Sequence, residues 1–555
     1  MAAALFAAIA LSCEAGKAEA APHEVRLVAD VLPGPSGSYA EDMIEFGGKV
    51  FFTARTVETG YELWRLDGRA PVLVADVNPG SASSYPTGLT VHGDHLYFRA
   101  DDGTTGTELW RTDGQTAERL ADIYPGENSS SPNSFTSLGS HLYFSAGTPL
   151  TGTELWRTDG TTTELVMDIN PGAPSSGPSV LTRFGDRIFF SASTAAQGTE
   201  PWSTDGTTTA IVQNIAAGAN PSYPNNFTEL GNHLYFNATD AAGTELWRTD
   251  GTMTTQVMDI RPGASSSSPS GFEQFGNHLY FRANDGVAGI ELWRTDGTTT
   301  SMVADINPGA GNANISDLTA VGPTLYFSAD DGVTGREPWA FDGATPRPIA
   351  DLWPGPEESS PDDFIELGGH VYFQAYTQAH GDELWGTDGS TVELVSDLLP
   401  GPDGSDIYDM APIGDSVYFA GDDGIHGGEI FRLAPPDRTV TVQITGKRIK
   451  LNRKGIGRVN LTCPAAEETG PCSGKLTLQT RRRVKVGKKR RKLVLARSSF
   501  SIEAGRASQI ALKVKPAHRK VLRRIKSARN TVAVANVTDQ SGNAARVTRR
   551  FKTRP

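Results

Sequence analysis

The sequence predicts an all-β chain: a β-propeller of nine four-stranded blades, followed by a small β-sandwich. Three observations lead to this prediction. Strand-like segments recur at a spacing of about 46 residues, a strand without partners stands at each end of the repeated region, and the charge of the chain reverses near Pro435. The 60 Gly and 34 Pro among 555 residues fit a chain with many tight turns.

The charge reversal separates two domains with different electrostatic partners. Residues 436–555 carry 32 Lys and Arg against 5 Asp and Glu, a net charge of +27. Because the whole chain has 51 basic and 64 acidic residues, residues 1–435 keep 19 basic and 59 acidic ones, a net charge of −40. We therefore expect a repeat domain at 21–435 and a basic domain at 436–555.

The first 20 residues predict a secretory signal peptide. An apolar run from Ala2 to Ser12 precedes Ala18-Glu19-Ala20, the small-x-small pattern that favours cleavage after Ala20. An imperfect lipoprotein box that ends at Cys13 leaves lipid anchoring as the alternative. We expect a secreted or cell-surface protein, and no apolar run is long enough for a transmembrane helix.

Two motifs mark the repeat. Glu-Leu-Trp or a near variant recurs nine times at spacings of 46 residues, with a single spacing of 45. Asp-x-x-Pro-Gly alternates with it, and one degenerate copy opens at Asn214. A period of roughly 40 to 50 residues made of short strands is typical of propeller blades. The tryptophan position of the first motif is filled by Trp64, Trp110, Trp156, Trp202, Trp247, Trp293, Trp339, Trp385 and Phe431.

One unit, residues 134–172, contains the four predicted strands of a blade. The second strand is an almost unbroken apolar run, which indicates that neighbouring blades cover both of its faces. Asp159-Gly160 predicts a tight hairpin between the third and fourth strands. The predicted strands are Phe135–Leu138, His141–Ala146, Glu154–Arg157 and Glu164–Ile169.

The two ends of the repeat are complementary. Val25–Val31 has the pattern of a fourth strand without its blade, and the last copy stops at Leu433 without a fourth strand. Pairing of these ends closes the ring with nine blades and leaves no open sheet edge. An open arc and two smaller rings are the alternatives.

These motifs resemble the ELWxxDGT repeat family of exported bacterial proteins. Five copies read Glu-Leu-Trp-Arg-x-Asp-Gly, and the resemblance extends over about three quarters of the chain. It implies a propeller-like exported protein and transfers no catalytic or binding residues. Pro201 and Pro338 depart from the motif, and because proline lacks the backbone donor we expect irregular strands there.

The basic domain shows seven strand patterns, typical of a β-sandwich, and a basic helical pattern at 516–528. It resembles the immunoglobulin-like tail domains of exported actinobacterial proteins. Cys463 and Cys472 remain after signal cleavage, so export favours a disulfide over two free thiols. The predicted strands are 439–444, 458–463, 475–480, 493–496, 509–514, 531–537 and 546–551.

A glutamate precedes Leu-Trp in every copy and has two interpretations. Nine carboxylates drawn into a ring repel one another and would favour a divalent cation such as calcium. Alternatively, each accepts hydrogen bonds at the junction between two blades, which we favour. The repeated tryptophan likewise predicts core packing rather than a sugar-stacking platform. The glutamates are Glu62, Glu108, Glu154, Glu200, Glu245, Glu291, Glu337, Glu383 and Glu429.

The basic domain contains a dense basic run that predicts either a solvated hairpin tip or a contact for a polyanion. Since export argues against nucleic acid, an anionic polymer of the cell envelope is the expected partner. The residues of this run are Arg481, Arg482, Arg483, Lys485, Lys488, Lys489, Arg490, Arg491 and Lys492.

No catalytic or metal-binding motif stands out in the sequence. Zinc-protease, Cys-x-x-Cys, phosphate-loop and nucleophile-elbow patterns are missing. We therefore expect a monomeric, non-enzymatic binding or adhesion protein without a cofactor, whose propeller face binds a glycan or a protein. The alternative is a glycan-active hydrolase or lyase that uses carboxylates of the inner strands as acid and base.

Overall fold

The computed structural model describes residues 23–435, 442–464, 471–487, 489–538 and 544–555. The described chain is all-β apart from the helix α1 (Pro516–Arg524) and a 3-10 turn. The chain divides into two compact units, and the boundary in the sequence lies between Ala434 and Pro435. The predicted signal peptide at 1–20, with Cys13, lies outside the described residues. None of the helices in the described part is long and apolar enough to span a membrane.

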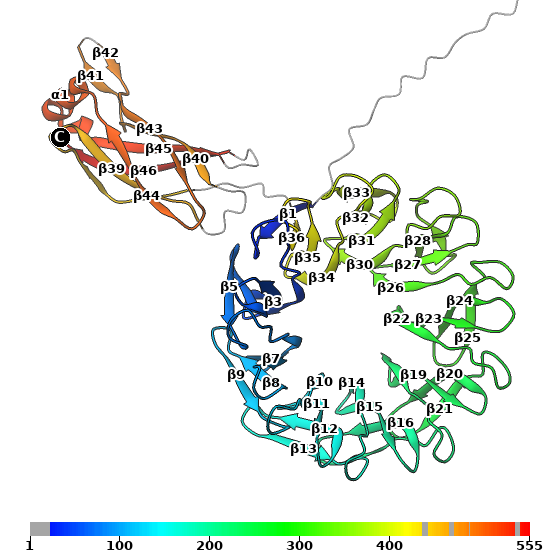
Figure 1. Cartoon of the computed structure of the whole chain (residues 1–555). Coiled ribbons are helices and arrows are strands. Elements are labelled where there is room, and N and C mark those ends of the chain that lie inside the picture. Colours follow the sequence, from blue (N-terminus) through cyan, green and yellow to red (C-terminus); the bar gives the residue numbers. More distant parts are fainter. Residues whose placement is uncertain (1–22, 436–441, 465–470, 488, 539–543) are drawn as a thin grey trace, which may run out of the picture. The chain divides into compact units, whose positions relative to one another are not determined.

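Nine four-stranded antiparallel sheets form a closed ring (Figure 1). The first strands of neighbouring sheets contact one another all the way round, so they surround the axis and the fourth strands lie on the rim. This is the nine-bladed propeller that the repeat predicts.

In blades one to four the strands are β2 (Glu41–Phe46), β3 (Lys49–Thr56), β4 (Gly60–Asp67), β5 (Ala70–Ala75); β6 (Thr87–His92), β7 (His95–Asp101), β8 (Thr107–Thr112), β9 (Ala117–Ala121); β10 (Asn133–Leu138), β11 (His141–Thr148), β12 (Gly152–Thr158), β13 (Thr163–Met167); β14 (Ser179–Phe184), β15 (Arg187–Thr194), β16 (Gly198–Thr204), β17 (Thr209–Ile211). In blades five to eight they are β18 (Asn225–Leu230), β19 (His233–Asp240), β20 (Gly243–Thr249), β21 (Thr254–Met258); β22 (Ser270–Phe275), β23 (His278–Asn284), β24 (Ile290–Thr295), β25 (Thr300–Ala304); β26 (Ser316–Val321), β27 (Thr324–Asp330), β28 (Arg336–Phe341), β29 (Arg347–Pro348); β30 (Asp362–Leu367), β31 (His370–Thr377), β32 (Gly381–Thr387), β33 (Val392–Ser396).

The ninth blade is built from both ends of the repeat. Its strands are β34 (Tyr408–Ile413), β35 (Ser416–Asp422), β36 (Gly428–Ala434) and, as the fourth, β1 (Glu24–Ala29). Val25 faces Leu433 across an antiparallel pair. The predicted closure is therefore confirmed, and the open arc and the two smaller rings are wrong.

The hydrophobic core lies between blades. Phe144 and Ala146 of the third blade are fully buried and cluster with Tyr97 and Leu109 of the second blade, with Trp156 packed against the same cluster. Each second strand is therefore covered on both faces, as its unbroken apolar run predicts. The repeated tryptophan belongs to this core.

The two prolines in the motif shorten the strands that they face. The fourth strands beside Pro201 and Pro338, β17 and β29, have 3 and 2 residues, whereas the other fourth strands have 5 or 6. In the third blade, Leu155 forms a bulged pair with Met167 of the fourth strand. Proline lacks the N–H group, and Pro201 and Pro338 form no equivalent pair. The strands that carry the prolines, β16 and β28, keep their length and a continuous register with β15 and β27, so the irregularity expected in them falls on the facing fourth strands instead.

The basic unit is a sandwich of two sheets around its own core. One sheet has the order β37-β39-β44 and the other β38-β46-β45-β40-β43, while β41 and β42 form a separate hairpin. The strands are β37 (Gln443–Thr445), β38 (Arg448–Lys450), β39 (Ile456–Thr462), β40 (Cys472–Thr480), β41 (Val484–Val486), β42 (Lys489–Arg491), β43 (Val494–Ile502), β44 (Ala507–Lys513), β45 (Asn530–Thr538) and β46 (Ala544–Arg554).

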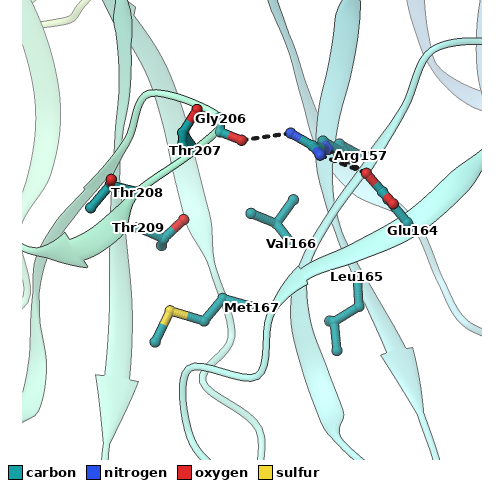
Figure 2. Close-up of a pocket in the computed structure, with 9 residues that line it drawn as sticks. All are labelled: Arg157, Glu164, Leu165, Val166, Met167, Gly206, Thr207, Thr208 and Thr209. Carbon is teal, nitrogen blue, oxygen red and sulfur yellow. Dashed lines mark hydrogen bonds and ion pairs between the residues drawn. The ribbon is translucent and has the colours of Figure 1, made fainter.

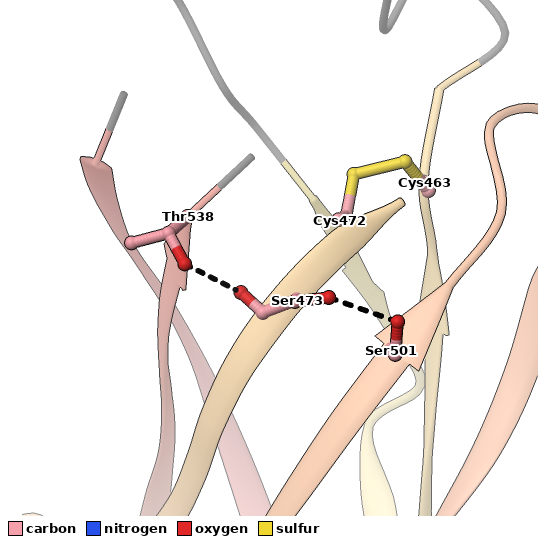
Figure 3. Close-up of a disulfide and its surroundings, with 5 residues drawn as sticks. All are labelled: Cys463, Cys472, Ser473, Ser501 and Thr538. Atoms are coloured by element: carbon pink, nitrogen blue, oxygen red, sulfur yellow. Dashed lines mark hydrogen bonds between the residues drawn. A yellow bond between two sulfur atoms is a disulfide. The ribbon is translucent and has the colours of Figure 1, made fainter. Parts of the chain in front are cut away.

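A disulfide joins the two sheets of the sandwich. Cys463 follows β39 of the small sheet, Cys472 opens β40 of the large one, and both are fully buried (Figure 3). Beside it, the Ser473 and Ser501 hydroxyls lie 2.8 Å apart and bridge β40 to β43. The predicted disulfide is confirmed, and the two cysteines are not free thiols.

We predict that removal of residues 24–31 destabilises the ring and promotes association. The deletion strips β36 of its partner and takes away the backbone donor of Val31 that bonds Glu429. Calorimetry should show a melting temperature lower by about 10 °C or more, and light scattering should show oligomers. A chain that begins at His23 is the control. Equal melting temperatures and a monomeric profile for both chains would contradict the role of β1.

Candidate functional site

The repeated glutamates are the hydrogen-bonding centres of the blade junctions. In the third blade Glu154 is fully buried on β12. It accepts the Ile169 N–H at 2.9 Å, the Ser176 N–H at 2.8 Å and the Ser176 hydroxyl at 2.5 Å. The Ser176 carbonyl in turn accepts the Ser193 N–H of the next blade at 2.8 Å. One carboxylate thus fixes the connector that docks the following blade.

The same junction crosses the seam where the ring closes. Glu429 of the ninth blade accepts the Val31 N–H at 2.8 Å, the Ser38 N–H at 2.9 Å and the Ser38 hydroxyl at 2.8 Å. The Ser38 carbonyl accepts the Arg55 N–H of the first blade at 2.9 Å. Because the seam repeats the geometry of the other junctions, the N-terminal segment acts as an ordinary connector.

All nine glutamates are fully buried, and burial raises the pKa of each carboxyl. The hydrogen bonds at the junctions oppose that effect and favour the ionised form. Across the described ranges, no three His, Cys, Asp or Glu side chains gather as a metal ion would require. The glutamates therefore sit one to a junction, each with its own donors.

The sixth blade departs from this pattern. Glu291 faces Ala313 where the other junctions have a serine, so it loses the hydroxyl donor. Its Oε2 accepts the Ile306 N–H at 2.6 Å, and its enclosed Oε1 has no partner in the described chain. Burial, with a smaller contribution from Asp305, raises the pKa of Glu291 to about 7.

The arginine and glycine of the motif form a second link between blades. Arg157 donates through Nη1 to the Gly206 carbonyl of the next blade at 2.6 Å and through Nη2 to Glu164 at 2.6 Å (Figure 2). Gly206 has φ +86°, and a Cβ there would lie 2.5 Å from the Tyr143 hydroxyl, so a side chain at this position would be strained and would displace Tyr143. The groove of about 460 Å³ in Figure 2, lined by Val166, Met167 and Thr209 among others, is the space beside this link.

The basic run forms a hairpin, as one of its interpretations predicts. β41 and β42 pair antiparallel, with Lys485 opposite Arg490, and the described basic side chains from 481 to 492 are exposed. Val484 is buried and anchors the hairpin to the core of the sandwich. Lys488, the remaining residue of the run, lies outside the described residues.

Sequence reasoning missed an arc of carboxylates on the inner strands. The second residue of each first strand sits in a β-bulge with positive φ, and in four consecutive blades this residue is aspartate. Burial raises the pKa of all four, and for Asp317 burial together with Asp362 raises the pKa to about 6. The residues of this acidic arc are Asp317 (φ 53°), Asp363 (φ 55°), Asp409 (φ 56°) and Asp42 (φ 56°).

The acidic arc borders a pocket at the axis. The pocket has a volume of about 390 Å³ and is formed by the inner strands of four blades, with Asp42 and Asp409 in its lining. Asp409 accepts the Met43 N–H of the next blade at 2.9 Å. Alignment of the nine blades would have exposed the aspartates, but their position needs left-handed backbone, which Asp, Asn and Gly all tolerate. Their identity alone therefore gave no functional signal.

Comparisons with known proteins add little to these observations. No protein-family model and no curated protein matches the sequence. Among solved structures, the chain is similar to one from a study of two prolyl endopeptidases, at 11% identity and a TM-score of 0.34, over 68% of this chain and 54% of that one.

Two further structures give similar values. A puromycin-hydrolysing peptidase of Mycobacterium tuberculosis aligns at 12% identity and a TM-score of 0.32, over 71% of this chain and 59% of that one. Sqt1 of Saccharomyces cerevisiae aligns at 11% identity and a TM-score of 0.33, over 63% of this chain and 95% of that one. The chain thus spans little more than half of either peptidase structure, and the sheet topology rather than these values defines its fold.

We predict that Ala313→Ser stabilises the ring, and more at pH 8 than at pH 5. The folded-state pKa of Glu291 lies above its usual value, so the unfolded state binds fewer protons there and stability falls as pH rises toward about 7. A serine hydroxyl should stabilise the ionised carboxylate by about 1 kcal/mol or more. Denaturant titration at both pH values measures the gain.

Ser130→Ala is the matched control for this prediction, because it removes from Glu108 the donor that Glu291 lacks. It should lower stability, most strongly at pH 8. If Ala313→Ser has the same effect at both pH values, the ionised state of Glu291 does not limit the stability of this junction.

Proposed function

We propose that this chain is an exported, non-enzymatic binding protein of the ELWxxDGT repeat type. In this proposal one face of the ring binds a glycan or a protein, and the immunoglobulin-like basic domain docks on an anionic polymer of the cell envelope. The charge of the basic domain carries the proposal.

The described part of the basic domain has 30 Lys and Arg and a single acidic residue, Glu503. None of the ion pairs found in the described chain involves this domain. Arg448 faces Lys552 and Lys450 faces Arg554 between adjacent strands. Like charges in such positions destabilise a sheet. An external polyanion would relieve this repulsion, whereas solubility alone needs much less charge.

The ring supports the binding proposal in a different way. The glutamate, tryptophan and arginine of the repeat are engaged in the junctions between blades. Contact with a ligand therefore falls to the residues that differ from blade to blade, which lie on the inner strands, on the connectors and at the facing ends of the second and third strands. Such variable positions on a rigid scaffold are where binding sites are normally found.

A second candidate function is glycan cleavage by a hydrolase or a lyase, and the acidic arc favours it. Asp317 and its neighbour Asp362 lie on adjacent inner strands, and the raised pKa of Asp317 suits a general acid. The acidic arc lies in four of the nine blades, and an active site would likewise occupy only part of the ring.

We predict that the hairpin drives polyanion binding by the full chain. Replacement of the nine basic residues from 481 to 492 by Ser should weaken binding to a polyphosphate or teichoic-acid polymer by at least about tenfold at low salt. Binding by the native chain should fall by two or more orders of magnitude between low and moderate salt. Sedimentation or biolayer interferometry across a salt series measures both.

A control variant separates a local site from diffuse charge. It replaces basic residues on β38 and β46, including Arg448, Lys450, Lys552 and Arg554, by Ser. Equal losses in the two variants would contradict a hairpin site. The domain from 435 to 555 has its own core and disulfide, so it can be tested alone. Tight binding by this domain with weak binding by the full chain would indicate that the acidic ring competes for it.

We predict that, if the second candidate function is correct, Asp317→Asn abolishes turnover. Reducing-end release from a panel of polysaccharides measures it, and activity should be highest below pH 6, where Asp317 stays protonated. Ser270→Asp, at a neighbouring inner strand, is a control for added charge. Absence of turnover on every substrate by the native chain would exclude this candidate for the panel.

A further inference from the structure

The departures from the repeat gather at the seam where the ring closes. We define the tyrosine cluster as Tyr39, Arg55, Tyr61, Tyr85 and Tyr408. At the blade position of Tyr61, four other blades have threonine, and no other blade has an arginine at the position of Arg55 or a tyrosine at that of Tyr408. The cluster therefore serves no need that all the blades share.

The side chains of the cluster form one surface from three blades. Arg55 on β3 and Tyr61 on β4 are direct partners across the sheet. The Tyr61 ring stacks on Tyr85 with centroids 5.7 Å apart and planes 24° apart. The Arg55 guanidinium lies 4.6 Å from the centre of the Tyr39 ring. Tyr39 and Tyr85 are 43% and 64% exposed, so solvent reaches their rings.

The backbone of the two exposed tyrosines is unusual. Tyr39 has φ 49° and Tyr85 has φ 48°. The same connector position is left-handed in every blade, where it is filled elsewhere mostly by Ser, Gly, Asn or Asp. A bulky residue in this conformation is strained. Tyr223 shares this strain, so the neighbours of Tyr39 and Tyr85, and not their backbone, distinguish the cluster. The left-handed backbone thus explains why small or turn-forming residues fill this position in most blades, but it does not explain the two tyrosines.

The surface has a recess between two of its rings. A Cβ added to Gly428 would meet the Tyr408 hydroxyl at 3.7 Å and Tyr39 Cδ1 at 3.8 Å, so the missing side chain leaves space between them. The Tyr408 hydroxyl and Arg55 Nε are both enclosed and lack a hydrogen-bond partner among the described residues. Both atoms lie beneath the surface of the cluster, so the ligand contacts fall to the exposed rings and to the remaining atoms of the Arg55 guanidinium.

Two carboxylates lie near Tyr408. Burial raises the pKa of Tyr408, and the nearby charges of Glu41 and Asp409 raise it further. Asp42 of the acidic arc follows Glu41 on β2. The recess thus combines exposed aromatic faces, one guanidinium and several acceptor oxygens, on a domain whose net charge is −40.

We propose that the tyrosine cluster binds a neutral saccharide, with a sugar ring against Tyr39 or Tyr85 and its hydroxyls bonded to Arg55 and Glu41. This inference rests on the proposed binding function and names the ligand class. Aromatic faces carry negative charge density and attract the C–H groups of a sugar ring. Carboxylates and a guanidinium supply planar acceptors and donors for its hydroxyls. The negative charge of the ring disfavours an anionic saccharide.

The test uses the full chain and an array of neutral oligosaccharides from β-glucan, chitin, xylan, mannan and galactan, followed by calorimetric titration of the best binder. Tyr39→Ser with Tyr85→Ser should weaken binding about tenfold or more, since serine is the repeat's own residue at this position. Gly428→Thr should do the same by filling the recess, because its Cβ makes only ordinary contacts and other blades carry threonine there.

Tyr223→Ser is the matched control. Tyr223 has the same connector position, φ 48° and the same 64% exposure, but Thr199 and Thr239 stand where the cluster has Tyr61 and Arg55. Its loss should change affinity by less than about twofold. Melting temperatures of all variants establish that they are folded.

The outcomes separate this inference from the proposed function. No binding to any neutral oligosaccharide, or equal affinity in the cluster variants and the Tyr223→Ser control, would overturn the saccharide site. Binding of polyanion by the basic domain is measured on the same sample and depends on salt, whereas stacking on tyrosine does not. Loss of only the salt-dependent binding would instead overturn docking by the basic domain and leave the saccharide site in place.

Discussion

The architecture of the ring depends on a buried carboxylate that is bonded to a connector. At each junction a glutamate of the third strand accepts the backbone donors of the loop that leads to the next blade, and in eight of the nine a serine faces it. The carbonyl of the serine, or of Ala313 in the sixth blade, then accepts an N–H from the following blade. Since an ionised carboxylate is costly to bury unless its oxygens are bonded, the junction favours one loop geometry. The ring closes because Ser38 supplies the same contact to Glu429.

This constraint separates structural residues from functional ones. Residues that every blade repeats are those that every junction needs, and their charged and aromatic groups are engaged within the junctions. The residues that differ between blades lie on the connectors, at the bulged starts of the inner strands and at the facing ends of the second and third strands, where Arg55 and Tyr61 are found. There the acidic arc and the tyrosine cluster lie in neighbouring blades, from the seventh through the ninth to the second. The seam is therefore the part of the ring with the most distinct chemistry.

The two units of the chain differ in how far their charged side chains are bonded within the protein. The ring buries or bonds many of its carboxylates, through the junctions and through turn aspartates such as Asp159, which accepts the N–H groups of Thr161 and Thr162. The basic domain instead leaves its cations exposed, with almost no acidic residue to balance them. Its stability comes from an apolar core and the Cys463–Cys472 bridge, so its charge remains available to a partner.

The sequence determined the nine blades, the order of their strands and the closure by β1, because a strict 46-residue period repeats one local solution and the two ends of the repeat complement each other. It also located the basic hairpin, since a run of like charges between two strands has few alternatives. It left open whether Glu154 and its equivalents bond to protein or to a cation, because that depends on Ser176, a residue of the connector that strand patterns do not address. The acidic arc and the tyrosine cluster were decided only by the tertiary structure. Tyr39 and Tyr408 both lie beside Gly428 because the ring closes, and no local pattern in either segment encodes that placement.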